Sequence, residues 1–503
     1  MHRECALLLA SATAVAADQP APSFQQIEVA EHVYDGGWEH FVGGGVAVFD
    51  CNGDSLPDLF AAGGSNPSQL FRNTSGGDLS FRVDTPEALS LTGVTGAYPL
   101  DIDSDGFQDL AVLRVGEDLL LRGQPDCQFT PFADLNFQSD DHWTTGFSAT
   151  WEDGETLPTL AFGTYVDRYD PEGPFETCGP TLLYRPKGSG YAAPVPLEPG
   201  YCSLSILFSD WARTGRADLR VSNDRHYYVR GGQEQLWAME AEPRLYTEDD
   251  GWLPYSIWGM GIASRDLTGD GFSDVYLTSM GDQKFQVFDP SEDSPTWRDA
   301  TYEKGTTAHR PHVGGDGRPS TGWHAQFGDA NNDGLDDIFV TKGNVEQMPV
   351  AALNDPNNLM LQQPDGSFVE AAAKAGVASM AKSRGGALVD LNNDGQLDLV
   401  VVNRGAPLEV HQNTTTAGNW VLVDVSQNTS NRAAVGGFIE MRMPSGFQTR
   451  EITIGGGHAG GTSGLHHFGL GQAEAVELRM IWPDGSTGDW QAYDANQIIR
   501  LDH

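Results

Sequence analysis

The chain has 503 residues, with 30 Lys and Arg against 70 Asp and Glu, which gives a formal net charge of -40. A charge of this sign and size disfavours binding to nucleic acid and to anionic membrane surfaces. The 60 glycines and 28 prolines, without a long stretch of helical periodicity, are typical of many short strands joined by tight turns. The composition therefore predicts an all-β protein that binds no nucleic acid and has no transmembrane segment.

Residues 1–17 have the pattern of a secretory signal peptide. Arg3 precedes an apolar run over residues 6–10, and Ala14-Val15-Ala16 supplies a small-residue cleavage site. Glu4 is unusual in such a segment, and a wrongly assigned start codon is the alternative. The pattern predicts export, to the medium, the periplasm or the cell surface.

Four cysteines remain after removal of this segment, and an even number in an exported chain permits disulfides. Cys178 and Cys202 flank one segment rich in Pro and Gly, and we predict that they pair. Whether Cys51 pairs with Cys127 is left open by the sequence, and four buried free thiols are the alternative.

An acidic motif recurs along the chain from Asp50 onward. Intact copies begin at residues 50, 101, 266, 329 and 390, and degenerate copies begin at Trp151 and Asp210, so the spacing is between 50 and 63 residues. A period of this length built from strands predicts the blades of a β-propeller, here seven of them over residues 23–416.

Each repeat contains the strands of one blade. A small-residue strand such as 45–49 enters the acidic loop and a β-rich strand such as 399–402 leaves it. Third and fourth strands follow, as at 358–362 and 367–371. The last repeat ends near Asn413 without a fourth strand, whereas 23–30 has the fourth-strand pattern. We therefore predict that the N-terminal strand completes the seventh blade and closes the ring.

The acidic loops read Asp-x-Asp/Asn-x-Asp-Gly-x-x-Asp, with side-chain oxygens at positions 1, 3, 5 and 9. These oxygens and the carbonyl of position 7 suit a hard cation with six to eight ligands, and Ca²⁺ tolerates irregular geometry better than Mg²⁺. We predict about five Ca²⁺ sites that tie the blades shut. The predicted ligands are Asp50, Asn52, Asp54, Leu56, Asp58, Asp101, Asp103, Asp105, Phe107, Asp109, Asp266, Thr268, Asp270, Phe272, Asp274, Asp329, Asn331, Asp333, Leu335, Asp337, Asp390, Asn392, Asp394, Gln396 and Asp398.

Two alternatives compete with this interpretation. An EF-hand needs a bidentate Glu at position 12, where these loops have Ala61, Val112, Leu277, Val340 and Val401. The other alternative is that Asp, Asn and Gly merely favour turns, and five copies with one spacing argue against it.

The copies are not equivalent. Thr268 replaces the acid at position 3 and predicts a weaker site, and the copies at Trp151 and Asp210 are expected to bind nothing. The first loop has Gly53 at position 4 instead of a glycine at position 6, so its turn is expected to differ.

The loops and their flanking strands resemble the FG-GAP/VCBS repeats of integrin α-like propellers. The segments 258–266 and 322–329 are similar to later blades of the cartilage acidic protein 1 (CRTAC1-like) family. Residues 417–503 resemble the ASPIC/UnbV domain that accompanies such propellers. That match runs through Asn419-Trp420, Asn431-Arg432, Gly436-Gly437, Phe468 to Gly471, Trp482 to Gly485 and Asn496-Gln497, and it departs at Ala433 to Gly437, where the family more often has Ile-Gly-Ala.

The C-terminal region itself alternates as half-buried strands do, at 420–425, 438–443 and 476–481. We therefore predict a β-sandwich-like domain over 417–503. His466 and His467 are interpreted as edge-strand packing residues, with a metal site as the alternative.

No nucleophile elbow, zinc-protease motif or phosphate-binding loop occurs in the sequence. The best catalytic candidates are His324 on a predicted inner strand, His309 and His312 in a loop, and Arg265 and Arg384, all placed at a central channel. We favour the interpretation that Trp323 and His324 pack between blades.

The predicted function is a monomeric extracellular interaction or adhesion module that binds a protein or glycan through blade-face loops, and it rests on fold-level analogy. The alternative is a calcium-dependent carbohydrate-active enzyme, of lyase or dehydratase type, that uses the central channel.

Overall fold

The computed structural model describes residues 21–170, 177–224, 231–292, 294–307, 318–416, 418–444 and 446–503. The predicted signal peptide at 1–17, and His309 and His312, lie outside the described residues. Among the described residues, no helix is long and apolar enough to cross a membrane.

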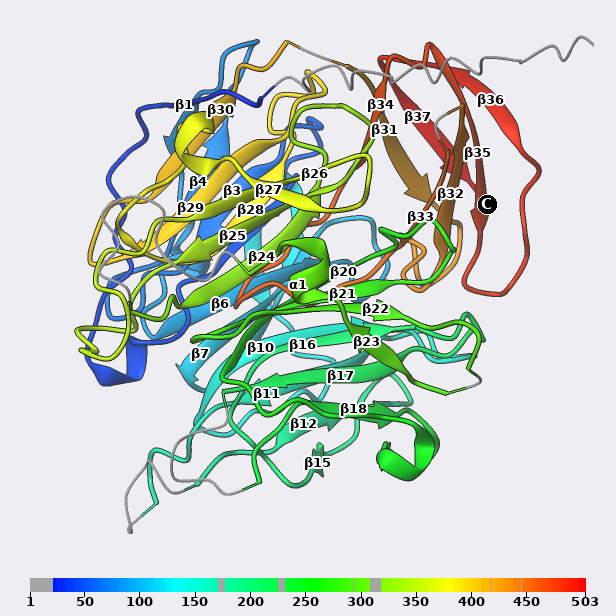
Figure 1. Ribbon diagram of the computed structural model, residues 1–503. Helices are drawn as coiled ribbons and strands as arrows, with labels where there is room; N and C mark the ends of the chain where they lie inside the picture. Colours follow the sequence, from blue (N-terminus) through cyan, green and yellow to red (C-terminus); the bar gives the residue numbers. More distant parts are fainter. Residues whose placement is uncertain are drawn as a thin grey trace, which may run out of the picture.

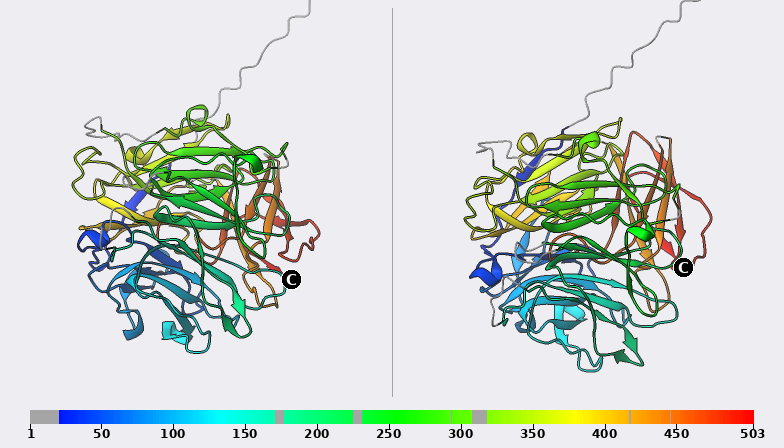
Figure 2. Two further views of the ribbon diagram at one scale, coloured as in Figure 1. Left: turned by 90° about the horizontal axis from the view of Figure 1, so that it is seen from below. Right: turned by 60° about the horizontal axis from the view of Figure 1, so that its bottom comes forward.

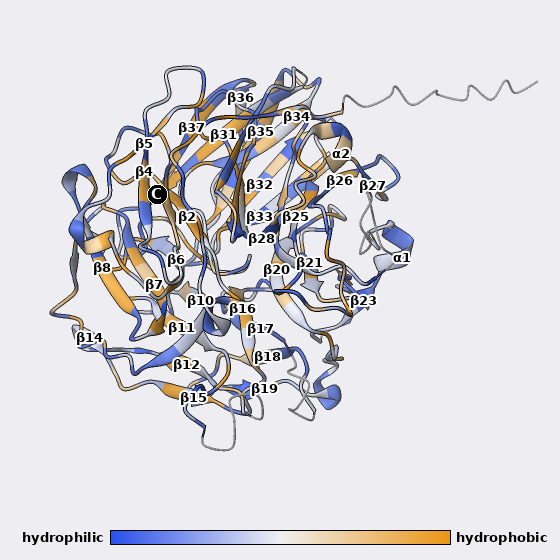
Figure 3. Cartoon of the chain, turned by 90° about the vertical axis from the view of Figure 1, so that its left-hand side faces the viewer, coloured by the Kyte–Doolittle hydropathy of each residue, from blue (hydrophilic) through white to orange (hydrophobic). Residues whose placement is uncertain are grey.

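Seven four-stranded blades form a ring around one axis (Figure 1). Seen along another direction, the inner strands of the blades surround the centre and the outer strands lie at the rim (Figure 3). The predicted all-β, seven-bladed propeller is confirmed.

The strands run from the axis outward in each blade. In blades 1 to 4 they are β2 (Val46–Phe49), β3 (Asp58–Ala61), β4 (Gln69–Asn73) and β5 (Phe81–Val83); β6 (Val94–Leu100), β7 (Asp109–Gly116), β8 (Leu119–Gln124) and β9 (Gln128–Pro131); β10 (His142–Thr150), β11 (Thr159–Thr164), β12 (Thr181–Tyr184) and β15 (Val195–Leu197); and β16 (Ser203–Ser209), β17 (Asp218–Asn223), β18 (Gln235–Ala238) and β19 (Arg244–Leu245). In blades 5 to 7 they are β20 (Gly259–Arg265), β21 (Asp274–Ser279), β22 (Lys284–Phe288) and β23 (Trp297–Asp299); β24 (Gly322–Gly328), β25 (Asp337–Lys342), β26 (Asn358–Gln362) and β27 (Phe368–Glu370); and β28 (Lys382–Val389), β29 (Asp398–Arg404), β30 (Glu409–Asn413) and β1 (Phe24–Gln26).

Short elements connect the strands. Two one-turn helices, α1 (Thr301–Lys304) and α2 (Ala372–Ala375), each end at a glycine with positive φ, Gly305 and Gly376. Such a glycine is the common way to stop a helix because it has no Cβ to clash.

The N-terminal strand closes the ring, as predicted. Strand β1 pairs antiparallel with β30, and Phe24 lies opposite Asn413. The Phe24 side chain is buried among apolar residues of blades 6 and 7. The two ends of the propeller sequence thus share one sheet, in which β1 covers the outer edge of β30.

The C-terminal region forms a sandwich of two sheets beside the ring (Figures 1 and 2). Its core consists of the inward-facing residues of both sheets, for example Val421 and Val423 of one sheet and Ile439 and Leu478 of the other. The strands are β31 (Asn419–Ser426), β34 (His466–Gly471) and β37 (Gln497–Asp502) in one sheet, and β32 (Phe438–Met443), β33 (Gly446–Glu451), β35 (Ala475–Ile481) and β36 (Gln491–Asp494) in the other.

The segment between β33 and β34 leaves the sandwich and enters the axis of the propeller. We call residues 454–463 the plug. Its backbone forms hydrogen bonds with inner strands of five blades. These bonds join Val48 N to Gly461 O (3.0 Å), Ala97 N to Ala459 O (3.1 Å), Ala149 N to Ile454 O (3.2 Å), Gly456 N to Ile206 O (2.8 Å) and Gly457 N to Ile262 O (2.7 Å).

Glycines on both sides allow this close approach. A Cβ on Gly45 would lie 1.8 Å from the carbonyl oxygen of Ala459, and one on Gly96 would lie 1.7 Å from the same atom. A residue with a Cβ cannot be accommodated at these distances. The plug can therefore pack against the inner strands only because glycine occupies these positions.

The open central channel assumed for the enzyme alternative is therefore a wrong expectation. The plug occupies the axis because its glycine-rich backbone fits between the inner strands. A cavity of about 140 Å³ remains beside it, lined in part by Arg265, His324 and Gln326.

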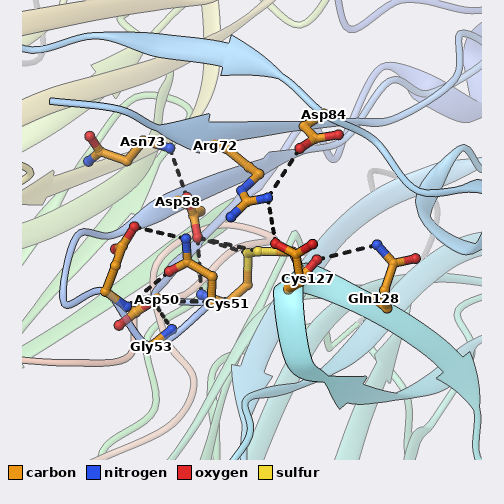
Figure 4. Close-up of a disulfide and its surroundings, with 12 residues drawn as sticks. Asp50, Cys51, Gly53, Asp58, Arg72, Asn73, Asp84, Cys127 and Gln128 are labelled. Carbon is orange, nitrogen blue, oxygen red and sulfur yellow. Dashed lines mark hydrogen bonds and ion pairs between the residues drawn. A yellow bond between two sulfur atoms is a disulfide. The ribbon is translucent and has the colours of Figure 1, made fainter.

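The part of the chain that the structure describes contains two disulfides. The predicted bond between Cys178 and Cys202 forms, and Cys51 pairs with Cys127, which the sequence had left open. The Cys51–Cys127 bond joins the acidic loop of blade 1 to the outer part of blade 2 (Figure 4).

We expect Phe24→Ala to lower the melting temperature by roughly 6 °C. Loss of a buried Phe side chain costs about 3 kcal/mol, and a large domain loses about 2 °C per kcal/mol. Thermal unfolding followed by circular dichroism checks this. The exposed neighbour Gln25 provides the control variant Gln25→Ala, which should melt like the parent. Deletion of residues 23–31 should be more damaging still, and a deletion without effect would contradict closure by this strand.

Candidate functional site

The acidic loops join the inner strand to the second strand of each blade, so they all lie at one end of the ring. The C-terminal domain covers this end. Gln448 Nε2 donates to Gly334 O (2.9 Å) in blade 6, and His467 Nε2 lies 3.1 Å from Gly395 O in blade 7. Ser104 of blade 2 donates its hydroxyl to the carbonyl of Ser430. The loops are therefore part of a domain interface.

All five intact loops share one backbone conformation. The φ angle is positive at position 4 and again at position 6 in each loop. In the first loop Gly53 has φ 79° and Ser55 has φ 71°. The expectation that this loop turns differently is wrong, because Ser55 adopts the left-handed conformation that glycine has elsewhere.

The carboxylate at position 1 organises the turn. Asp50 Oδ2 accepts the amide of Ser55 (2.7 Å), and Asp329 Oδ2 accepts the amide of Gly334 (2.7 Å). The same bond to position 6 occurs in the other three loops. The position 1 carboxylate therefore holds the turn by hydrogen bonds within the loop, without a bound ligand.

Position 5 has an equally regular role. Its Oδ1 accepts the amide of position 7 at 2.9 Å in every intact loop, as Asp394 does from Gln396. An asparagine at position 3 donates to the other oxygen, as Asn392 does to Asp394 at 2.9 Å. The amide nitrogen therefore points at the neighbouring acid, which leaves the Asn392 oxygen as the atom available to a cation.

The predicted ligands converge best in the second loop. Oxygen atoms of Asp101, Asp103 and Asp109 lie within 4.8 Å of one another. The Oδ1 atoms of Asp101 and Asp103 are buried and accept no hydrogen bond from the described residues. Buried oxygens that lack donors are costly unless a cation or water satisfies them. The donor set of this loop thus fits a hard divalent cation.

Burial of these carboxylates disfavours their charged forms. Burial, together with the carboxylates of Asp103 and Asp101, raises the pKa of Asp109 to about 8. Burial likewise raises the pKa of Asp274 to about 7, with Asp266 and Asp270 adding to the effect. A cation among these groups would oppose both causes, because opposite charge favours the ionised carboxylate.

The carboxylate at position 9 has a structural role that the sequence did not reveal. Asp58 accepts the amide of Cys51 (3.0 Å) with one oxygen and the amide of Asn73 (2.8 Å) with the other (Figure 4). The same pair of bonds occurs in the other four intact loops. Position 9 therefore ties the loop to the third strand of its blade, whether or not it also contacts a cation.

The degenerate loop at Asp210 keeps this framework and carries a basic side chain within it. Asp210 still accepts the amide of Gly215 (2.7 Å), and Asp218 still accepts an amide of the third strand, that of Met239 (2.9 Å). Arg216 at position 7 forms an ion pair with Asp218 (3.1 Å). The guanidinium supplies a positive charge at position 7, where the intact loops have an uncharged residue.

The remaining catalytic candidates on the axis are packing residues. His324 is buried, and its Nδ1 accepts the backbone amide of His458 in the plug (3.1 Å). Trp323 donates its indole N–H to Gly343 O (2.7 Å), and the Arg384 guanidinium lies 4.0 Å above the Trp323 ring. Trp323 and His324 thus pack against His458 of the plug, a contact that the sequence did not reveal. Arg265 lies at the other end of the axis beside Asp336 (3.5 Å).

The histidine pair behaves as expected for an edge strand. His466 and His467 belong to β34, which is an edge of its sheet, and His467 packs against the propeller. Burial lowers the pKa of both rings to about 4, so they stay neutral at physiological pH.

Comparisons with known proteins agree with this architecture. A family model described as an FG-GAP-like repeat matches residues 50–112, and the ASPIC and UnbV model matches residues 427–503. The predicted likeness to the cartilage acidic protein 1-like family is confirmed.

The relatives themselves match over part of the chain. Cartilage acidic protein 1 of Xenopus tropicalis is 32% identical over 108 residues, which cover 21% of this chain and 17% of that protein. The human protein of the same name is 28% identical over 179 residues, which cover 33% of this chain and 24% of that protein. The chain thus matches less than a quarter of the length of these curated relatives.

Solved structures also match the chain. The structure of BBS1N in complex with ARL6DN aligns with a TM-score of 0.43 at 12% identity and covers 78% of this chain and 98% of that chain.

We expect two variants in blade 5 to distinguish the structural role of position 9 from the candidate ligand role of position 5. Asp274→Ala tests the first role and Asp270→Ala tests the second. Asp274→Ala should destabilise the protein by about 2 to 4 kcal/mol even in chelator, because the amides of Leu267 and Phe288 lose their acceptor. Asp270→Ala should be nearly neutral in chelator and destabilising only in calcium. Denaturant unfolding in both buffers checks this. Equal behaviour of the two variants would contradict the division of roles.

Proposed function

We propose that the protein is an exported, calcium-loaded scaffold that binds a protein or glycan partner through its exposed loops. The observation that carries the proposal is the sealed axis. The protein's own backbone occupies the axis, where propeller enzymes hold substrate, and its contacts with His324 and the inner strands leave only a cavity of about 140 Å³ beside it. This geometry favours binding at the surface over catalysis on the axis.

Export is supported by the disulfides and by the N-terminal sequence. Two disulfides form among the described residues, and disulfides persist in oxidising compartments. The N-terminal pattern at 1–17 has the features of a signal peptide. We infer an extracellular, periplasmic or cell-surface location on these grounds.

Calcium is proposed for the five intact loops, with the side-chain oxygens of positions 1, 3, 5 and 9 and the carbonyl of position 7 as ligands. The bound ion would supply positive charge between carboxylates that otherwise repel one another. Calcium at ten times its dissociation constant contributes ~1.4 kcal/mol per site. In the second loop a bound cation would compete with Arg432, which lies 3.8 Å from Asp101, for the same carboxylate.

We expect chelation to lower the melting temperature and calcium, but not magnesium, to restore it. Metal analysis after dialysis against calcium should give up to five ions per chain. Asp394→Ala should remove one ion, whereas Glu155→Ala, at the same position of the degenerate loop at Trp151, should remove none. An unchanged melting curve after verified metal removal would argue against calcium.

Binding and turnover can be separated in one screen. The purified protein should bind one class of glycan or extracellular protein on an array, saturably and with loss of signal in chelator. The same glycans incubated with the protein and calcium should yield no product by mass spectrometry. Reproducible product formation would favour the alternative of a calcium-dependent lyase or dehydratase. His324→Ala is not a suitable catalytic control, because it removes the acceptor for the plug.

A further inference from the structure

The end of the ring opposite the acidic loops has a pocket of about 310 Å³. Its lining residues stand where inner strands begin, as Trp143 and Trp323 do, or just after second strands end, as Tyr165 and Asp224 do. The acidic loops follow the other ends of the same inner strands. The volume lies in the range of small-molecule sites.

Aromatic side chains dominate this pocket. Trp38, Phe41, Trp143, Tyr165, Trp258 and Trp323 line it, together with Val42, Val166, Val345 and the methionines 260, 280 and 348. The rings meet at steep angles: Trp38 and Trp143 are 5.1 Å apart at 77°, and Trp143 and Tyr165 are 4.9 Å apart at 72°. Adjacent rings at such angles form the walls of a box instead of a flat stacking platform.

Asp224 is the one carboxylate among the described residues that line the pocket. Asp224 accepts a hydrogen bond from the Tyr165 hydroxyl, and among the described residues no Lys, Arg or His lines the cavity. Burial raises the pKa of Asp224 to about 7, so the carboxylate is ionised in mildly alkaline buffer. Two of the rings already contact a guanidinium of the protein: Arg384 lies 4.0 Å from the centroid of the Trp323 ring, and Arg404 lies 4.8 Å from that of the Phe41 ring.

The floor of the pocket belongs to the sealed axis. Trp323 packs on His458 of the plug, with ring centroids 5.0 Å apart, and His458 Nδ1 lies 3.1 Å from Met260 O. A ligand can therefore enter at the mouth but cannot pass through the ring. Trp38 stands at the mouth, with 37% of its surface exposed.

We propose that this aromatic pocket binds a small ligand that carries a quaternary ammonium group, such as choline. Methylated cations lack N–H donors, so they gain most from aromatic faces and little from the hydrogen-bonding groups that a sugar would need. A carboxylate beside the rings adds charge complementarity without requiring a donor. The apolar methionines accommodate the methyl groups. This site is independent of the calcium loops and of any macromolecular partner.

The decisive experiment compares choline with 3,3-dimethylbutan-1-ol, its neutral isostere, by isothermal titration calorimetry at pH 8 in calcium. We expect choline to bind at least about tenfold more tightly, since a cation over aromatic rings contributes on the order of tenfold or more in affinity. Tryptophan fluorescence should change on titration with choline and not with sodium chloride. Equal affinity for the two compounds, or binding of neither, would overturn the proposal.

Two variants test the residues. Asp224→Asn should weaken choline binding about tenfold and leave the neutral alcohol unaffected, because only the charge is lost. Trp38→Ala should weaken choline binding by a similar factor. Trp490→Ala is the matched control, since Trp490 lies in the C-terminal domain under Arg442 and Arg479, and it should bind choline like the parent. Unchanged choline binding in both pocket variants would contradict the assignment.

The trimethylammonium group can come from a free solute or from a lipid headgroup. Sedimentation with phosphatidylcholine vesicles, with and without excess choline, separates the two sources. Choline-sensitive sedimentation identifies the headgroup as a ligand, and choline binding without sedimentation identifies the free solute.

Discussion

Backbone contact between the plug and the inner strands is the interaction on which the rest of the structure depends. It joins two domains with separate apolar cores into one body, and it does so through amide and carbonyl groups that would otherwise be buried without partners. The contact seals the axis, places the sandwich over the acidic loops and gives the aromatic pocket its floor. Glycine is essential on both sides, because a side chain on Gly45 or Gly96 would collide with Ala459.

Electrostatics at the domain interface follow from this placement. The propeller presents a ring of acidic loops, and the C-terminal domain meets it with arginines, such as Arg432 near Asp101 and Arg450 near Asp336 (3.6 Å). These ion pairs offset part of the negative charge. The loop at Asp210 is neutralised from within by Arg216, whereas the intact loops retain buried carboxylates with raised pKa values. The same framework can thus be completed by a side chain in one blade and by a divalent ion in another.

Much of the fold could be predicted from the sequence because its signals are local and repeated. The motif spacing indicated seven blades, and the unpaired last repeat indicated closure by the N-terminal strand. The plug could not be predicted in the same way, because its contacts are between backbones. Its only signal in the sequence is the glycine-rich segment 455–461. The role of Asp58 and its equivalents depends on the register of the third strand, which the motif does not encode. The aromatic pocket could not be predicted from the sequence, because its residues come from five blades and are far apart along the chain.

The two ends of the ring are linked through the plug. The plug belongs to the domain that contacts the acidic loops, and its His458 contacts Trp323 and Met260, which line the pocket at the opposite end. Any change in how the C-terminal domain sits on the loops must move His458 or break the hydrogen bonds that hold it. The hydrogen bonds to the inner strands are distributed along one short segment, so the plug forms a continuous contact from the C-terminal domain to the floor of the aromatic pocket. The two ends of the ring are therefore joined by direct contacts, although the acidic loops and the pocket share no residue.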